Sequence, residues 1–588
     1  MDNKRIIVVG GGLAGLMATI KICEAGVPVD LFSVVPVKRS HSVCAQGGIN
    51  GAKNTKGEGD STDIHFYDTV HGGDYLADQP PAKAMCEAAV PIIDLTDRMG
   101  VMYSRTPEGL LDFRRFGGTK YHRTAFAGAT TGQQLLYALD EQVRRYEAEG
   151  LVKKYEFWEF LSFVPDGAGE CVGITALNFL DMSIEAFPAG AVIICTGGPG
   201  MIFGKTTNSM INTGAAASRC WQQGAYYANP EMIQVHPTAI PGVDKLRLMS
   251  ESARGEGGRC WVPKKQGDTR PPRDIPEDER WYFFEEKYPS YANLVPRDIA
   301  SREIYHICRD LKMGVGGENV VYLDLTHISR EELDRRLGGI LEIYEKFVGV
   351  DPHVEPMKVY CSVHYSMGGM WIDYEHMTNV PGLLAAGEVD FAYHGANRLG
   401  ANSLVSAIYG GIVAGPRAVK HGESKKWPTA AQSLLDAETK RQVEILDGLK
   451  KLDGGENVFM LHQELGEWMT EHVSVVRYNE QLNKVHDKIM ELKGRARRIG
   501  IHDGATRFNQ YLTFVRQFDD MLELARAIVL GALLRNESRG SHYKPEFPKR
   551  DDENWLKTTM TKWTPGGPEF FFRPVDASII QPKERKYD

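Results

Sequence analysis

The sequence predicts an α/β fold in which a Rossmann-like nucleotide-binding domain is interrupted by an α+β capping domain. A helical domain and an irregular C-terminal tail complete the predicted fold. Three observations support this prediction: a glycine-rich turn near the N-terminus, apolar strands that end in glycine turns far apart along the chain, and polar helical periodicity after about residue 427.

The first unit is a strand, a glycine turn, a helix and a second strand. Residues 5–9 form a short, mostly β-branched run, and Gly10, Gly12 and Gly15 then complete the pattern G-x-G-x-x-G. Helical spacing continues to Glu24, and residues 27–32 form the next strand. Such a turn brings backbone N–H groups and the positive end of a helix dipole to a pyrophosphate. The three glycines are therefore predicted to bind the pyrophosphate of a dinucleotide.

The residue at the end of the second strand argues against a nicotinamide cofactor. A nicotinamide-binding domain usually has an acidic residue there that accepts hydrogen bonds from the ribose, whereas this chain has Ser33.

Two later strands indicate that the nucleotide-binding domain is interrupted. Residues 191–195 and 382–386 are apolar, and each run ends in a glycine turn. We expect the first part of this domain over residues 1–239, the capping domain over 240–355 and the second part over 356–426. Within the insertion, the proline-rich and charged segment 262–293 is expected to be an exposed excursion rather than core.

The C-terminal third changes in character. Apolar residues at helical spacing, such as Leu482, Val485 and Ile489, predict a helical domain over residues 427–545. Residues 546–588 are rich in proline, basic and aromatic residues without clear periodicity, so we expect a tail that wraps over a neighbouring surface.

Composition excludes several classes of protein. The chain has 588 residues, of which 42% are hydrophobic and 25% charged, as in globular proteins. A net charge of −8 argues against a nucleic-acid-binding surface. No apolar run is long enough for a direct membrane span, and four glycines interrupt residues 6–20, which disfavours a secretory signal. The nine cysteines, without a CxxC pair, suit reduced thiols and predict no metal or iron–sulfur site.

Several longer motifs occur in a fixed order along the chain. The first is the loop from Arg39 to Gly48, which contains His41. The others are Phe116-Gly117-Gly118, His236-Pro237-Thr238, Ser250-Glu251 with Arg254-Gly255-Glu256-Gly257-Gly258, Pro296-Arg297-Asp298, His364-Tyr365-Ser366-Met367-Gly368-Gly369 and His394-Gly395-Ala396-Asn397-Arg398-Leu399-Gly400. Over nearly the full chain, this set resembles the flavoprotein subunit of succinate dehydrogenase and fumarate reductase.

The resemblance implies FAD as the cofactor, bound covalently. His41 would be joined through a ring nitrogen to the flavin 8α carbon, a bond that raises the flavin potential in the family. The resemblance assigns the ribose region to Ser33 and Glu388. It assigns further cofactor contacts to Ser40, Gln46, Gly47, Gly48, Ser403 and Leu404.

A dicarboxylate substrate needs cationic or N–H donors at both ends, and arginine offers bidentate geometry. His236, His364 and Arg398 are such donors, and the resemblance assigns the substrate carboxylates to them. It also implies a helping hydroxyl at Ser250 and places Phe116 against the substrate.

Oxidation of succinate removes a hydride from one carbon and a proton from its neighbour, so the site needs a base. The residues alone favour His236 or Glu251. The resemblance instead assigns this role to Arg297, with Glu251 and Arg254 as a proton relay. The arginine side chain stays protonated up to pH values far above 7, which makes it a natural acid for fumarate reduction.

The resemblance also implies partners: an iron–sulfur protein subunit and a membrane anchor cytochrome b subunit that reacts with quinone. The overall sequence is most similar to those members of the family that use menaquinone and a dihaem cytochrome b. The chain would then lie peripherally on the cytoplasmic side of the cell membrane. Two alternatives are a soluble L-aspartate oxidase-like flavoenzyme with noncovalent FAD, which His41 disfavours, and a catalytically silent flavin-binding subunit, which the retained relay disfavours.

Overall fold

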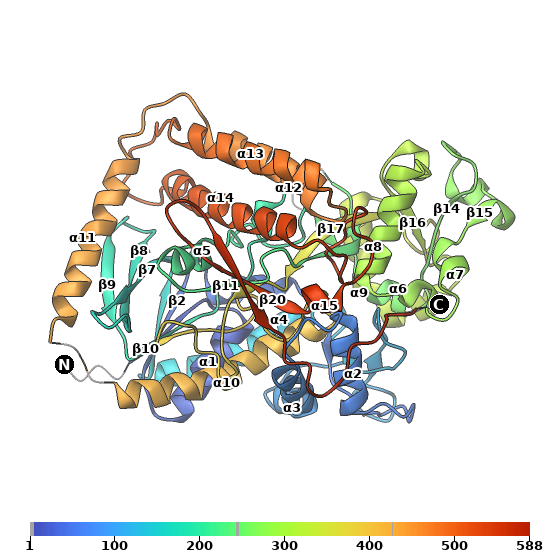
Figure 1. Cartoon of the computed structure of the whole chain (residues 1–588). Coiled ribbons are helices and arrows are strands. Elements are labelled where there is room, and N and C mark those ends of the chain that lie inside the picture. Colours follow the sequence, from blue (N-terminus) through green and yellow to red (C-terminus); the bar gives the residue numbers. More distant parts are fainter. Residues whose placement is uncertain (1–4, 243–245, 426, 428, 588) are drawn as a thin grey trace.

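A five-stranded parallel sheet forms the centre of the nucleotide-binding part (Figure 1). The computed structural model describes residues 5–242, 246–425, 427 and 429–587. The strand order is β19-β10-β1-β2-β6, and all neighbours are parallel. The strands are β1 (Ile6–Val9), β2 (Val29–Ser33), β6 (Val152–Glu156), β10 (Ala191–Ile194) and β19 (Leu383–Ala385). The predicted interruption is confirmed, since β19 joins this sheet from far along the chain.

The glycine turn between β1 and helix α1 (Leu13–Glu24) is tightly enclosed. Gly10 has φ +118°, and a Cβ there would lie 2.2 Å from the carbonyl oxygen of Cys195 on β10. A Cβ on Gly15 would lie 1.9 Å from the carbonyl oxygen of Gly10. Only glycine allows these approaches. They pack α1 onto the sheet with its N-terminus at the carboxyl ends of the strands.

Helices and two small sheets surround this core. Helix α10 (Asn402–Ser424) packs along α1, and its N-terminus faces the same edge of the sheet. The other helices of this part are α2 (Thr62–Gly72), α3 (Gln79–Arg98), α4 (Thr131–Ala148) and α5 (Ala215–Gln222). The small sheets have the orders β3-β5-β4 and β7-β8-β9, with strands Ile49–Asn50, Phe113–Arg114, Thr124–Ala125, Trp158–Pro165, Cys171–Asn178 and Ile184–Pro188 for β3, β4, β5, β7, β8 and β9.

A six-stranded sheet connects the nucleotide-binding part to the insertion, in the order β13-β12-β17-β16-β14-β15. Its strands are β12 (Ile233–Ile240), β13 (Arg247–Leu248), β14 (Arg259–Pro263), β15 (Arg280–Trp281), β16 (Val321–Asp324) and β17 (Met357–Ser366). The helices of the insertion are α6 (Ser252–Gly255), α7 (Phe283–Lys287), α8 (Arg297–Tyr305) and α9 (Arg330–Val348). Strands β12 and β17 pair directly, so they are the two connections through which the insertion is held.

The expectation of an exposed excursion over residues 262–293 is wrong in part. Ile275, Phe283 and Phe284 are at most 1% exposed and belong to the main hydrophobic core. The apolar side chains among the charged residues face inward, because β15 pairs with β14 and brings α7 against the sheet.

The predicted helical domain is confirmed. It contains α11 (Ala431–Leu449), α12 (Val458–Val473), α13 (Asn479–Ala496) and α14 (Gln510–Leu534). Leu482, Val485 and Ile489 are fully buried on one face of α13, as their spacing predicts.

The C-terminal tail is not irregular throughout. After α15 (Asp552–Trp555), strands β20 (Lys557–Lys562) and β21 (Glu569–Pro574) form a hairpin. The hairpin extends β11 (Tyr227–Ala228) and β18 (Gly369–Met370) into a four-stranded sheet, β18-β11-β20-β21. The remaining chain then crosses α2 and α3 toward the insertion (Figure 1). The exact domain boundaries stay predictions, and those at residues 426 and 588 lie outside the described residues.

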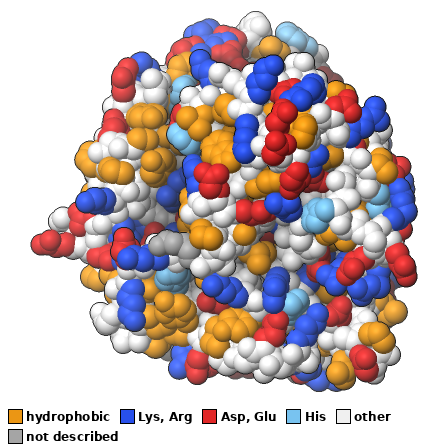
Figure 2. Space-filling model, turned by 90° about the vertical axis from the view of Figure 1, so that its right-hand side faces the viewer, with side chains coloured by type: hydrophobic (Ala, Val, Ile, Leu, Met, Phe, Trp, Pro, Cys, Tyr) orange, Lys and Arg blue, Asp and Glu red, His pale blue; other side chains and the backbone are white. Residues whose placement is uncertain are grey.

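Acidic and basic side chains are intermixed on the face shown in Figure 2, which is the right-hand side of Figure 1. Within the described part of the chain, no helix is both long and apolar enough to cross a membrane.

Candidate active site

The loop that contains His41 lies at the N-terminus of α1. A short 3-10 helix, His41–Cys44, forms this loop, and the backbone N–H of Leu13 donates to Ser42 Oγ at 3.3 Å. Gly12 is the N-cap residue of α1, and Ser40 is buried just before His41. The backbone N–H of Ser209 donates to His41 Nδ1 at 3.2 Å. The predicted pyrophosphate turn and the predicted flavin-bearing histidine are thus next to each other.

The following residues, Gln46 and Gly47, accept hydrogen bonds from a buried arginine. Arg114 donates from Nε to the carbonyl oxygen of Gly47 at 2.9 Å and from Nη2 to that of Gln46 at 3.1 Å. A Cβ on Gly47 would lie 2.6 Å from the Phe116 ring, so the loop lies directly on this ring. Gln46 Oε1 is buried and accepts no hydrogen bond from any described residue. This arrangement leaves a polar acceptor for a bound group.

The other predicted cofactor residues follow strand ends or start a helix at the same edge of the sheet. Ser33 is the last residue of β2, and Glu388 follows β19. Ser403 and Leu404 lie in the first turn of α10. Glu388 accepts from the backbone N–H of Ser366 at 3.1 Å, and burial raises the pKa of Glu388 to about 7.

Two predicted substrate histidines lie on the paired strands β12 and β17. The His236 and His364 rings are 5.0 Å apart between centroids. His236 Nδ1 accepts from the Thr238 N–H at 3.2 Å, and His364 Nδ1 is 2.7 Å from Thr207 Oγ1. Burial, together with the positive charge of Arg297, lowers the pKa of both imidazoles well below the usual value. Both rings are therefore neutral, and His236 Nε2 is buried with no partner among the described residues.

Arg398 is a buried cation that forms no ion pair with any described carboxylate. Its side chain is 2% exposed, its guanidinium lies 4.5 Å from the centre of the Tyr365 ring, and its Nε has no described partner. Burial, reinforced by the charge of Arg297, lowers the pKa of Arg398 to about 9. A buried charge without a counterion is costly, so an anion at this position would be strongly stabilised.

A chain of charged groups joins Arg297 to Arg254 through Glu251. Glu251 Oε2 accepts from Arg297 Nε at 2.9 Å and Nη2 at 2.7 Å, and Glu251 Oε1 accepts from Arg254 Nη2 at 2.7 Å. The Glu251 side chain is fully buried. Burial alone would raise the pKa of Glu251, but the two guanidinium groups hold it below its usual value. Glu251 is therefore ionised and links two cations.

Glycines bring Phe116 against this chain of charges. A Cβ on Gly117 would lie 2.3 Å from Glu251 Oε1, and a Cβ on Gly400 would lie 2.8 Å from Glu251 Oε2 and 3.0 Å from Phe116. Ser250 is also buried, with its hydroxyl 2.7 Å from that of Ser252. Segments that are hundreds of residues apart thus enclose Glu251.

Gln234 was not predicted as a site residue. Its Oε1 accepts from Arg297 Nη1 at 3.0 Å, and its Nε2 donates to the carbonyl oxygen of Arg398 at 2.7 Å. It therefore connects the two arginines. Its position two residues before His236 on a strand is the signal that places it on the same face.

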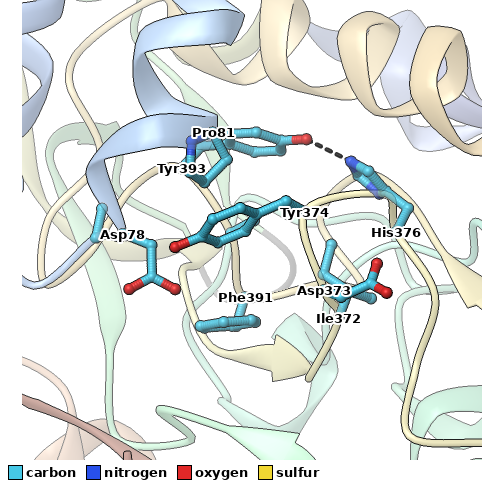
Figure 3. Close-up of a pocket in the computed structure, with 10 residues that line it drawn as sticks. Asp78, Pro81, Ile372, Asp373, Tyr374, His376, Phe391 and Tyr393 are labelled. Atoms are coloured by element: carbon cyan, nitrogen blue, oxygen red, sulfur yellow. Dashed lines mark hydrogen bonds between the residues drawn. The ribbon is translucent and has the colours of Figure 1, made fainter. Parts of the chain in front are cut away.

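A small pocket elsewhere does not compete with this site. It has a volume of about 10 Å³ and is lined by residues that include Asp78, Tyr374, Phe391 and Tyr393 (Figure 3). That volume holds about one water molecule. The described residues also contain no group of three or more His, Cys, Asp or Glu side chains placed to hold a metal ion.

The fold and the site define a class: a flavoprotein with a buried cationic site beside its cofactor-binding edge. Residues 5–404 match the family model of the FAD binding domain, and residues 462–587 match that of the fumarate reductase flavoprotein C-terminus. The chain belongs to the family of flavoprotein subunits of succinate dehydrogenases and fumarate reductases, which are FAD-dependent oxidoreductases.

The relatives match along almost their whole length. The succinate dehydrogenase flavoprotein subunit of Bacillus subtilis is 64% identical over 591 residues, covering 100% of this chain and 99% of the relative. A fumarate reductase flavoprotein subunit of a Serratia species is 34% identical, covering 100% and 96%. A solved quinol fumarate reductase chain from E. coli has a TM-score of 0.89 at 32% identity and covers 99% of this chain and 98% of that chain. The predicted family and fold class are confirmed.

Proposed function

We propose that this chain is a catalytic subunit that interconverts succinate and fumarate, with FAD bound covalently to His41. One observation carries the proposal: a buried chain of Arg297, Glu251 and Arg254 ends beside neutral imidazoles and Arg398, a cation with no ion pair to a described carboxylate. This arrangement combines donors for two carboxylates with a route for a proton.

The donors suit a small diacid. Arg398 would bind one carboxylate and gain a counterion that the described residues do not supply. His236 Nδ1 lies near both the N–H and the carbonyl oxygen of Thr238. In the tautomer in which Nδ1 accepts from this N–H, Nε2 carries the proton and would donate to a substrate carboxylate. His364 would donate at the same end, with Ser250 and the Phe116 ring completing the walls. Neutral imidazoles avoid further cationic repulsion beside Arg297 and Arg398.

The proton step is assigned to Arg297. In fumarate reduction its guanidinium would donate a proton to one carbon, and the carboxylate of Glu251 would stabilise and then restore the charged form by relay from Arg254. In succinate oxidation the same groups would move the proton outward. A buried, bidentate pair holds the donor in a single geometry, which general acid catalysis requires.

When bound, FAD supplies the two-electron chemistry by accepting a hydride from succinate or donating one to fumarate. The residues fit this group: the enclosed glycine turn and the α1 N-terminus suit its pyrophosphate, and Gln46 offers an unused acceptor. Since His41 Nδ1 accepts from Ser209, we assign the covalent bond to Nε2. Gly10, Gly12, Gly15, Ser33, Ser40, Gln46, Gly47, Gly48, Glu388, Ser403 and Leu404 complete the proposed cofactor site.

The electrons need an acceptor outside the subunit. The proposed partners are an iron–sulfur protein subunit and a membrane anchor cytochrome b subunit that exchanges electrons with menaquinone. These partners would hold the chain on the cytoplasmic side of the membrane. The relatives that are named as subunits of succinate dehydrogenase and fumarate reductase support this assembly.

The test combines flavin attachment with turnover. After acid denaturation and gel electrophoresis, flavin fluorescence should stay with the wild-type polypeptide, and the purified complex should oxidise succinate with an artificial acceptor. His41→Ser should bind FAD noncovalently, so that its flavin is released only on denaturation. It should lose succinate oxidation while keeping part of its fumarate reduction, because the flavin potential falls. His306→Ser, an exposed histidine on the insertion, is the matched control. Free flavin from wild type together with aspartate oxidation would instead favour an L-aspartate oxidase-like enzyme.

A further inference from the structure

We propose that Arg585, in the C-terminal segment, is a positioning residue for the proton step. It binds Asp298, the residue that follows Arg297 in helix α8, and so fixes the N-terminus of the helix that carries the proposed acid. This inference rests on the proposed function of Arg297.

The contact between Arg585 and Asp298 is bidentate. Arg585 Nη1 lies 2.8 Å from Asp298 Oδ2, and Nη2 lies 3.2 Å from Oδ1. The Asp298 side chain is fully buried, and its other described cation is Arg302, at 3.3 Å on the same helix. A bidentate arginine restricts both the position and the rotation of the carboxylate that it binds. Because Asp298 lies in the first turn of α8, that restriction extends to Arg297.

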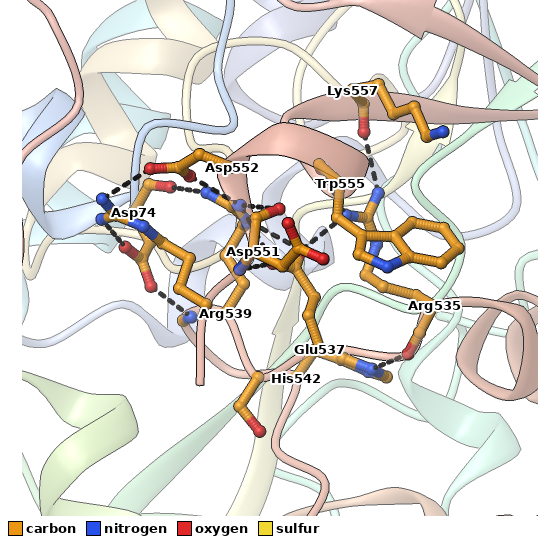
Figure 4. Close-up of polar contacts among 12 residues, drawn as sticks. Asp74, Arg535, Glu537, Arg539, His542, Asp551, Asp552, Trp555 and Lys557 are labelled. Carbon is orange, nitrogen blue, oxygen red and sulfur yellow. Dashed lines mark hydrogen bonds and ion pairs between the residues drawn. The ribbon is translucent and has the colours of Figure 1, made fainter. Parts of the chain in front are cut away.

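The same guanidinium also contacts the nucleotide-binding part. Arg585 Nη1 is 3.4 Å from Asp74 Oδ2, beyond the end of α2. Asp74 is itself fixed, since it accepts from the backbone N–H of Gly540 and from Arg550 Nη1 at 2.8 and 2.9 Å. Figure 4 shows Asp74 in the polar network that surrounds Arg539 and Asp552. Arg585 therefore connects Asp74, in the nucleotide-binding part, to Asp298 on the insertion.

The segment that carries Arg585 is itself hydrogen-bonded to Gln79, the first residue of α3. Gln79 Oε1 accepts from the backbone N–H groups of Ile579 and Ile580 at 2.9 and 2.7 Å, and Gln79 Nε2 donates to the Ile580 carbonyl at 2.7 Å. The segment thus approaches α8 from a fixed starting point.

A second contact reaches the insertion two residues later. Tyr587 is 4% exposed and lies between His71 on α2 and Tyr291 of the insertion, with ring centroids 5.5 and 5.1 Å away. Residues 575–587, named here the C-terminal strap, therefore bind the insertion through a charged contact and an aromatic contact.

The contact between Arg585 and Asp298 bears on the position of Arg297. The relay requires Arg297 to face Glu251 and the substrate at the same time, and a misplacement of about 1 Å can reduce catalysis by roughly 100-fold. Without Arg585, Asp298 would keep Arg302 as its one described cation, and the start of α8 would gain freedom. We therefore expect the loss of Arg585 to affect the proton step rather than substrate binding.

The experiment compares Arg585→Gln, Asp298→Asn and the double variant in the complete FAD-loaded complex. Lys586→Gln is the matched control, since this neighbouring side chain is 68% exposed and pairs only with Glu584 among described residues. The measurements are kcat and KM for fumarate reduction, the solvent deuterium isotope effect on kcat, the bound FAD content, and hydrogen–deuterium exchange over residues 297–305.

Arg585→Gln should lower kcat by about 10-fold or more with little change in KM or FAD content, and should increase the solvent isotope effect. Hydrogen–deuterium exchange over residues 297–305 should rise. The kcat of the double variant should be no lower than that of the less active single variant, because both substitutions act through one contact. An unchanged kcat, additive losses or a loss explained by missing FAD would overturn the proposal. If wild type itself fails to interconvert succinate and fumarate, the proposed function fails, while unchanged exchange in Arg585→Gln would separately refute the strap contact.

Discussion

Arg297 is held by groups that oppose its cationic surroundings. Glu251 binds it through one oxygen and Arg254 through the other, while Gln234 accepts from its remaining nitrogen. Arg398, the other nearby cation, has no described counterion. The site therefore contains more positive than negative charge, which favours a dianionic substrate.

Replacing Arg297 by alanine tests this assignment. Arg297→Ala should lower kcat for both directions by at least about 100-fold, the usual size of general acid–base catalysis. FAD should remain bound, because the proposed cofactor residues lie on other elements. The measurement is kcat together with the flavin absorbance of the purified complex. Arg273→Ala, whose side chain is 79% exposed on the insertion, should keep normal turnover. Succinate oxidation near the wild-type rate in Arg297→Ala would remove arginine from the proton step.

At the level of single residues, the sequence identified the charged residues of the site but not the residues that hydrogen-bond to them. His236, Arg297 and Arg398 lie in motifs that the family resemblance identifies. Gln234 and Arg114 belong to no such motif, and the partners that bring them into the site, Arg297 and Gly47, are more than 60 residues away in the chain. Spacing along a sequence does not reveal a hydrogen bond that depends on how separate strands pair.

Among the elements, prediction succeeded where the hydrophobic pattern is simple. Strands β1 and β10 are unbroken apolar runs buried on both faces, and both were predicted. Strand β12 carries polar site residues and was not identified as a strand. The hairpin of β20 and β21 was also missed, because β21 has a largely exposed sequence without regular alternation.

The turn after β19 contains a buried carboxyl group whose protonation should affect stability. Asp390 Oδ1 accepts from the Ala392 N–H at 2.9 Å, whereas Oδ2 is buried without a hydrogen-bond partner among the described residues and lies 4.0 Å from His376 Nδ1. Burial lowers the pKa of His376 to about 4, so this imidazole offers no charge near neutral pH. Burial raises the pKa of Asp390 to about 8.

The direction in which stability changes with pH follows from the difference between the folded and unfolded pKa values of Asp390. The folded pKa of this acid lies above its unfolded value of 3.8, so folding keeps a proton that the unfolded chain releases. Stability is therefore lost as pH rises between these values, by up to about 1.4 kcal/mol per pH unit. Asp390→Asn should abolish this loss, so its midpoint of thermal unfolding should rise relative to wild type from pH 6 to pH 8. Asp447→Asn, at an exposed carboxylate, should show no such trend. A difference from wild type that is constant across this range would contradict the prediction.

In the whole molecule, buried ion pairs join segments that are distant in the chain. Arg535 follows α14 directly and binds Glu231, near the start of β12, at 2.7 Å and Glu537 at 2.8 Å. It also donates to the carbonyl oxygen of Lys557 on β20 at 2.8 Å (Figure 4). The helical domain, the C-terminal hairpin and the nucleotide-binding part thus meet at one guanidinium.

Removing that guanidinium should loosen all three parts together. Arg535, Glu231 and Glu537 have no exposed side-chain surface. Arg535→Leu would therefore remove one cationic donor from each of the two buried carboxylates, and a donor from the carbonyl oxygens of Trp555 and Lys557. Loss of one partner from a buried ion pair typically costs about 3–5 kcal/mol. We expect the midpoint of thermal unfolding, followed by circular dichroism on the FAD-loaded protein, to fall by several degrees. Arg535→Lys should fall less, since it keeps the charge but loses the fork of donors. Arg507→Leu, at an exposed position, should unfold like wild type. Equal midpoints for Arg535→Leu and Arg507→Leu would show that the three parts do not depend on this contact for their stability.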